Sequence, residues 1–166
     1  MKILLLEDEL MLNNAISEYL KNIGHMVESF SDGQEVLDNI NNTYDLLILD
    51  INVPTKDGFE ILSELNSKKI YIPTIFISAL IDIEDISKAY SLGCREYIKK
   101  PFHLGELGIK INQILKKEQN NTTHIKFSEN YSYSKDKQTL YFNGEPQSLT
   151  KKQLEIVHIL ALNINM

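Results

Sequence analysis

The sequence has a single cysteine, no long apolar run and no excess of positive charge, and each of these absences excludes a class of protein. One cysteine in 166 residues excludes an internal disulfide framework and a cysteine-rich zinc site. No apolar run approaches the roughly 18 residues that a membrane span needs, and the run after Met1 stops at Glu7, too soon for a signal peptide. The 17 basic and 23 acidic residues give a net charge of −6, which argues against holding nucleic acid by bulk charge. We therefore expect a cytoplasmic protein without a membrane segment.

Up to about Lys117 the chain alternates short β-type runs with amphipathic helical stretches. We expect strands at residues 3–6, 26–30, 45–49, 72–77 and 96–99, with a helix after each, the last over 104–117. The first helix is predicted to bury one face, formed by Leu10, Leu12, Ile16, Tyr19, Leu20 and Ile23. The repeats predict an α/β domain with a doubly wound sheet of five parallel strands. Its strand carboxyl ends share one edge, where ligands bind.

The chain after Lys117 follows a different pattern. Residues 118–124 (EQNNTTH) are polar and are predicted to be a linker. Beyond them, β-type runs alternate with turns, and Asn143-Gly144 is a strong hairpin signal. Thr150 and Gln153 have the spacing of a capping box that opens a helix. We therefore divide the chain into a domain at 1–117, a linker at 118–124 and a smaller piece at 125–166.

Polar residues stand at the ends of four predicted strands. Glu7-Asp8 follow the first strand, Asp50 the third, Ser78 the fourth and Lys100 the fifth. Three carboxylates at one edge raise one another's pKa unless a cation joins them, and an oxygen-only site suits Mg²⁺. With an ammonium and a hydroxyl beside them, the set suits transfer of a phosphoryl group onto a carboxylate. Each residue alone has an ordinary explanation as a turn or cap, so the prediction rests on their combination.

Four segments carry a family resemblance. LLLEDE at 4–9, LILDINVP at 47–54, ISA at 77–79 and YIKKPF at 97–102 follow the order and spacing of one family, together with Gly58. On these segments the chain resembles the receiver domain of a two-component response regulator. The resemblance covers 1–117 and implies a flavodoxin-like (βα)5 fold of strand order 2-1-3-4-5.

The resemblance implies an acceptor and a metal site. Asp50 would be the phosphoacceptor, and a sensor histidine kinase would supply the phosphoryl group. Mg²⁺ would be held by the carboxylates of Glu7, Asp8 and Asp50 and by the backbone carbonyl of Asn52. Glu7 replaces the aspartate that is often found at its position, a substitution that the family also uses.

The resemblance also implies a switch. Ser78 would hydrogen-bond the phosphoryl oxygens after transfer, and Tyr97 would be the aromatic that turns inward when Ser78 moves. Lys100 would pair with the phosphoryl group, and its peptide bond to Pro101 is expected to be cis.

Residues 88–110 resemble the OmpR/PhoB type, whose receivers pair through the helix 4–strand 5–helix 5 face. Lys88, Glu96, Glu106 and Lys110 fall at or near the positions of the pairing residues. Arg95 departs from that type, which usually has an acid there. Because exposed ion pairs are individually weak, the resemblance implies a modest-affinity homodimer that phosphorylation strengthens.

Residues 125–166 resemble the N-terminal antiparallel β piece and first helix of an OmpR-type winged-helix domain, with Gln153 where that type usually has Glu. No recognition helix or wing follows before Met166. We therefore expect DNA binding in a full-length form and not by this chain alone. Two explanations remain: a piece of a longer transcription factor, which we favour, or a shortened regulator.

Two other functions are weighed against a phosphoacceptor switch. A phosphorylation-independent receiver-like interaction module would be favoured by loss of an acidic or lysine site residue, and none is lost. A Mg²⁺-dependent phosphatase also uses a strand-end Asp nucleophile, but Asn52 is a poor proton donor where such an enzyme has a second Asp. We expect no enzyme with separate substrate turnover, although a receiver catalyses its own phosphorylation and dephosphorylation. Cys94 is predicted to be a packing residue rather than a reactive thiol.

Overall fold

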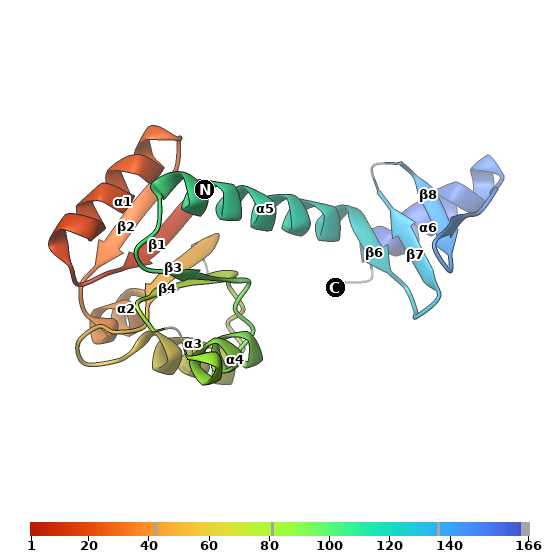
Figure 1. The fold of residues 1–166 in the computed structure, drawn as a ribbon. Coiled ribbons are helices and arrows are strands. Elements are labelled where there is room, and N and C mark those ends of the chain that lie inside the picture. The colour runs from red at the N-terminus through yellow and green to blue at the C-terminus, as the bar shows by residue number, and fades with distance from the viewer. Residues whose placement is uncertain (42, 81, 136, 164–166) are drawn as a thin grey trace. The chain divides into compact units, whose positions relative to one another are not determined.

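The chain folds into two compact units, Met1–Ile111 and Asn112–Met166, shown in a computed structural model that describes residues 1–41, 43–80, 82–135 and 137–163 (Figure 1). Strands and helices alternate in the first unit, whereas the second, in its described residues, has four short strands in succession followed by a helix. In chain order the elements are β1 (Lys2–Leu6), α1 (Leu10–Asn22), β2 (Met26–Phe30), α2 (Gly33–Asn39), β3 (Leu46–Asp50), α3 (Gly58–Ser67), β4 (Thr74–Ser78), α4 (Ile83–Ser91), β5 (Glu96–Lys99), α5 (Leu104–Thr123), β6 (His124–Lys126), β7 (Tyr131–Ser134), β8 (Thr139–Phe142), β9 (Glu145–Pro146) and α6 (Lys151–Asn163).

The first unit is a three-layer α/β domain. Its five strands are parallel in the order β2-β1-β3-β4-β5, which confirms the predicted doubly wound, flavodoxin-like fold. Helix α1 and the start of α5 cover one face of the sheet, and α2, α3 and α4 cover the other (Figure 1). The register pairs Leu6 with Leu49 and Asp50 with Ile77, so the residues that end β1, β3 and β4 lie side by side.

The apolar strand interiors form the core between these layers. All five residues of β3 and of β4 are buried, as expected for central strands with helices on both faces. On the α2–α4 side, Phe76 of β4 meets Phe59 of α3 edge to face, with ring centroids 5.2 Å apart. Burying a side chain of this size contributes roughly 1.5–3 kcal/mol, so the central strands anchor the edge that carries the polar residues.

Helix α1 buries a narrower face than its sequence pattern predicted. Its buried residues are Asn13, Ile16, Ser17 and Leu20, whereas Leu10 is 72% exposed and Ile23 is 44% exposed. The prediction that these two residues face the core was wrong. Leu10 is the first residue of α1 and Ile23 is its C-cap, so both lie at the ends of the helix and not over its buried middle.

Helix α5 extends further than predicted. It continues to Thr123, and β6 begins at His124, so the end predicted at Lys117 was wrong and most of the expected linker is helical. Residues 109–124 contain no glycine or proline. Once a helix has formed, each further residue adds a hydrogen bond, so polar residues continue it when no helix breaker intervenes.

The second unit is an antiparallel sheet of order β6-β7-β8-β9 with α6 packed on it. Ile125, Tyr133 and Ala161 form its small core. The predicted Asn143-Gly144 turn joins β8 to β9, with both residues at positive φ (49° and 84°) as a tight hairpin turn requires.

The predicted capping box at the start of α6 is confirmed. The backbone N–H of Thr150 donates to Gln153 Oε1 at 2.9 Å, and the N–H of Gln153 donates to Thr150 Oγ1 at 3.4 Å.

In the described ranges, no helix is both long and apolar enough to cross a bilayer.

The cysteine is expected to be unreactive in the folded protein. Cys94 is only 6% exposed, within the core cluster between the sheet and α2–α4. Burial, with a contribution from the charge of Glu96, raises the pKa of its thiol to about 12. At pH 8 the reactive thiolate is then only about one molecule in 10⁴. Ellman's reagent should react fully in denaturant and negligibly without it; rapid reaction of the native protein would show that this region opens.

Candidate functional site

Three buried polar side chains meet at the carboxyl edge of the parallel sheet. Glu7 follows β1 directly, Asp50 is the last residue of β3 and Ser78 is the last residue of β4. Their exposed fractions are 1%, 4% and 0%. Since ionised groups are seldom buried without a partner, the two carboxylates require a cation nearby.

Lys100 supplies that cation. Its Nζ donates to Asp50 Oδ2 at 2.6 Å and to Glu7 Oε1 at 2.8 Å. The lysine follows β5, and its backbone N–H donates to the carbonyl of Ser78 at 2.8 Å, which holds it beside β4. The Lys100–Pro101 peptide bond is cis. One ammonium group thus joins two carboxylates that come from strands more than 40 residues apart in sequence.

The charges of the three groups depend on one another. Burial raises the pKa of the Glu7 carboxyl, and the charge of Asp50 adds to this effect, while the hydrogen bond from Lys100 opposes it. Burial alone lowers the pKa of the Lys100 ammonium, but its hydrogen bonds to Asp50 and Glu7 prevail and raise that pKa. The lysine therefore stays charged throughout the neutral range.

The acidic residues fit a divalent cation. Glu7, Asp8 and Asp50 each offer a carboxylate oxygen, and the three oxygens lie within 4.8 Å of one another. Glu7 Oε2 is 2.7 Å from the Lys100 Nζ but outside hydrogen-bond geometry; among the described side chains it is a buried oxygen without a hydrogen-bond partner. Hard oxygen donors of this kind, with exposed Asp8 leaving access for water, suit Mg²⁺.

The loop after β3 is bound closely to Asp50. The backbone N–H of Asn52 donates to Asp50 Oδ1 at 3.1 Å. Gly58, the first residue of α3, packs closely against the backbone of the same residue: a Cβ at Gly58 would lie only 2.6 Å from the Asp50 carbonyl oxygen. Both oxygens of the Asp50 carboxylate therefore have a defined donor, one from the loop and one from Lys100.

Ser78 and Tyr97 meet at the loop that follows β4. Ser78 Oγ accepts a hydrogen bond from the N–H of Leu80 at 3.1 Å. The hydroxyl of Tyr97 donates to the carbonyl of the same Leu80 at 2.9 Å. The serine and the tyrosine are therefore connected through hydrogen bonds to one loop residue.

Asn13 is a site residue that the sequence analysis missed. From the buried face of α1, its Nδ2 donates to the carbonyl of Glu7 at 2.8 Å and to that of Phe30 at 3.4 Å. The amide thereby ties the loop carrying Glu7 to the end of β2. The available signal was an asparagine on the apolar face of a helix, a position where a polar residue needs a specific partner.

Three of the four residues predicted for a dimer face make contacts within their own unit. Lys110 Nζ lies 2.9 Å from Glu96 Oε2, and this hydrogen bond raises the pKa of the lysine. Lys88 Nζ lies 4.4 Å from the ring centroid of Phe59. Glu106 is exposed near the start of α5.

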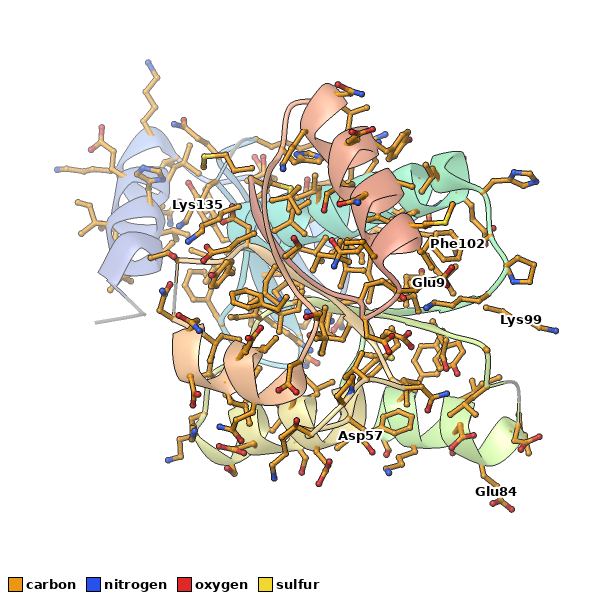
Figure 2. All side chains as sticks on the ribbon, turned by 90° about the vertical axis from the view of Figure 1, so that its left-hand side faces the viewer. Glu9, Asp57, Glu84, Lys99, Phe102 and Lys135 are labelled. Atoms are coloured by element: carbon orange, nitrogen blue, oxygen red, sulfur yellow. The ribbon has the colours of Figure 1, made fainter. Side chains whose placement is uncertain are left out.

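A cavity of about 550 Å³ opens beside Lys100. Glu9 and Phe102 are among its lining residues, and Figure 2 shows the two close to each other at one end of the sheet. The other lining residues are Met11, Leu12, Ala15, Ala79, Lys100 and Pro101. The approach to the carboxylate cluster is thus bordered by apolar side chains, including Met11, which is 81% exposed.

Comparison with known proteins assigns this arrangement to a family. Residues 3–112 match the response regulator receiver domain. The chain belongs to the response regulator receiver family. The matched residues coincide with the parallel α/β unit and include every member of the carboxylate cluster.

Relatives of this receiver extend the match beyond the first unit. The transcriptional regulatory protein RprY of Bacteroides fragilis is 31% identical over 169 aligned positions, which cover 99% of this chain and 72% of RprY. The structure of DrrB, an OmpR/PhoB homologue from Thermotoga maritima, matches with a TM-score of 0.64 and 25% identity, over 99% of this chain and 74% of DrrB. The non-phosphorylated HemR receiver domain of Leptospira biflexa matches with a TM-score of 0.66 and 30% identity, over 69% of this chain and 93% of that domain. The receiver is therefore of a two-component system with OmpR/PhoB-type homologues.

Proposed function

We propose that this receiver accepts a phosphoryl group on Asp50 from a sensor histidine kinase and uses Mg²⁺ to do so. The observation that carries the proposal is the Asp50 carboxylate, buried at a strand end and bonded to Lys100, with two more carboxylates beside it. In a salt bridge with only a structural role, one carboxylate is enough to balance the charge of one lysine. Three carboxylates around one ammonium leave negative charge that a divalent cation can balance.

The proposed reaction is a displacement at phosphorus. An oxygen of the Asp50 carboxylate forms a bond to phosphorus as the phosphorus–nitrogen bond of a phosphohistidine breaks, and the imidazole leaves with the electron pair. Lys100 balances charge on the carboxylate and the phosphoryl oxygens, which is most of what such a transfer demands of a protein. Mg²⁺, held by Glu7, Asp8 and Asp50 with the carbonyl of Asn52, would supply further neutralisation.

We infer that the phosphorylated state is transmitted through Ser78 and Tyr97. A phosphoryl group on Asp50 offers acceptors to the Ser78 hydroxyl and to Lys100. Movement of Ser78 would break its bond with Leu80 and so change the bond that Tyr97 makes to the same residue. The α4–β5–α5 face, with Lys88, would then respond.

The two ends of the chain have different proposed roles. Residues 1–117 would be the phosphoacceptor domain, and residues 125–166 the N-terminal part of an OmpR-type winged-helix domain that contacts DNA in a full-length form. RprY, a transcriptional regulatory protein, and DrrB both align with nearly this whole chain and extend to greater length, which supports this assignment.

The proposal is tested by intact mass after incubation with Mg²⁺ and acetyl phosphate. We expect one added phosphoryl group when Mg²⁺ is present, and none when EDTA is present from the start of the incubation. A transient adduct would escape detection, so beryllofluoride, which mimics the phosphorylated carboxylate, is used in parallel and followed by chemical-shift changes around Asp50. Absence of both responses would support an interaction module that works without phosphate.

Reversing the charge of Glu106 is expected to weaken dimerisation. If phosphorylated receivers pair through the α4–β5–α5 face, Glu106→Lys places like charges across it and lowers the dimer fraction of the beryllofluoride-treated protein, measured by light scattering. Glu18→Lys, an exposed reversal on α1, is the control and should dimerise normally. Equal dimer fractions in both variants would contradict this assignment of the face.

A further inference from the structure

The loop between β3 and α3 contains a residue in an unfavourable backbone conformation. Thr55 has φ of 68°, in the left-handed region. A β-branched residue seldom adopts this conformation, which favours glycine, so something else in the structure must hold it there. Thr55 itself is exposed, and packing around its side chain does not explain it.

Contacts with the start of α2 hold this loop in place. The Thr55 hydroxyl donates to a carboxylate oxygen of Asp32, the N-cap residue of α2. The next residue, Gly33, donates its N–H to the carbonyl of Pro54 at 3.2 Å. A Cβ at Gly33 would overlap the carbonyl oxygen of Lys56, so the two segments lie in direct contact. We call the Thr55–Asp32 hydrogen bond the clasp.

The same loop is attached to the acceptor residue at its other end. Asn52 N–H donates to Asp50 Oδ1, and Gly58 N–H donates to the carbonyl of Ile51 at 3.1 Å. Asp57 caps α3 through its bond to the N–H of Glu60 at 2.7 Å, and Figure 2 shows it at that end of the helix. Only two residues separate Asn52 from Thr55, so we expect a shift at Thr55 to be transmitted to the backbone at Asn52.

We propose that Thr55 is a positioning residue for the metal and acceptor site, acting through its hydroxyl bond to Asp32. The clasp holds the loop so that the Asn52 carbonyl is available as a ligand and the Asn52 N–H stays on Asp50. This inference rests on the proposed function, because it assigns the loop to the same Mg²⁺ site. Thr55 touches none of the reacting atoms itself.

Three substitutions at Thr55 test the clasp. Thr55→Val keeps the branched shape and removes the hydroxyl, Thr55→Ser keeps the hydroxyl, and Thr55→Gly removes the hydroxyl while relieving the backbone strain. Asp32 is left intact, since it also caps α2. Thr43→Val is the matched control, because its hydroxyl also bonds to a surface side chain, that of Asn41, away from the site.

The primary readout is Mg²⁺ binding, measured by amide chemical-shift changes during a MgCl₂ titration of the full chain. Thr55→Val and Thr55→Gly are expected to weaken Mg²⁺ affinity roughly 10-fold, the scale found when a group supporting a metal ligand is removed. Thr55→Ser and Thr43→Val should bind as the wild type does. Wild-type Mg²⁺ affinity in Thr55→Val would show that the site does not need the clasp. Wild-type affinity in Thr55→Gly would show that the hydroxyl is not needed once the backbone strain is relieved, and either result overturns the inference.

A second readout separates positioning from loss of folded protein. In phosphorylation by acetyl phosphate, Thr55→Val should need more Mg²⁺ for half-maximal rate yet approach the wild-type rate at saturating Mg²⁺. A variant that is merely partly unfolded would lose amplitude at every Mg²⁺ concentration, and that pattern would overturn the inference. If wild-type protein binds Mg²⁺ but is never phosphorylated, the proposed function fails while the titration still decides on the clasp.

Discussion

Asp50→Asn is expected to abolish formation of the phosphoryl adduct with acetyl phosphate. The amide keeps the size of the side chain and can still accept a hydrogen bond from Lys100, but it lacks the anionic oxygen that attacks phosphorus. Intact mass spectrometry of the two proteins under identical Mg²⁺ and donor concentrations measures the difference. Because the substitution also removes one of three clustered carboxylates, Mg²⁺ binding should weaken in parallel.

The control for this result is Asp82→Asn. Asp82 is exposed, and its side chain makes no capping hydrogen bond at the start of α4. It should be phosphorylated as fully as the wild type. If Asp50→Asn still gains a phosphoryl group at another residue, the adduct does not report on this site, and the assignment of Asp50 is wrong.

Lys100→Met is expected to destabilise the metal-free protein by roughly 3 kcal/mol at neutral pH, because removing one partner of a buried ionic group leaves unpaired charge. The side chains of Glu7 and Asp50 are 0% and 6% exposed, so water can do little to replace the ammonium. Urea denaturation in EDTA measures the loss, and added Mg²⁺ should restore part of it by supplying a cation. Without Lys100 the pKa of Glu7 is raised further, so the deficit should shrink as the pH falls and Glu7 becomes protonated in the variant, since the protonated carboxyl no longer repels Asp50.

Lys110→Met provides the matched comparison. It removes an ion pair with Glu96 in which the lysine side chain is 31% exposed, and pairs of this kind contribute about 0–1 kcal/mol. If the two variants lose equal stability, or if Mg²⁺ stabilises them equally, then Lys100 does not compensate the carboxylate cluster.

The sequence predicted most of the edge where this cluster lies, because two strong physical signals coincide there. The apolar interior of β3, followed at once by Asp50, indicated both a buried strand and its end. In a parallel sheet those ends share one edge, so the positions of Glu7 and Lys100 in the chain were enough to place them near Asp50. Unbroken apolar runs, alternating with amphipathic helical stretches, are enough to predict which strands are central in the sheet.

The features that the sequence did not predict depend on three-dimensional context. Leu10 has the spacing of a core residue, but it is the first residue of α1 and is 72% exposed. Asn13 needed knowledge of which carbonyls lie opposite it. The backbone conformation of Thr55 contradicts its residue type, so no local propensity could have indicated it. The end of α5 was mispredicted because polar residues are typical of linkers and of exposed helices alike.

The spacing of the cluster along the chain has a consequence for its biosynthesis. Strand β1 lies between β2 and β3 in the parallel sheet, and Lys100 follows β5, the last strand of that sheet in chain order. The residues of β1 are therefore translated long before the strand and the lysine that they end up beside. A nascent chain that has reached Asp50 carries all the acidic groups without the ammonium that joins Glu7 to Asp50. We therefore expect the carboxylate cluster to gain its compensating ammonium during synthesis only after Lys100 has left the ribosome.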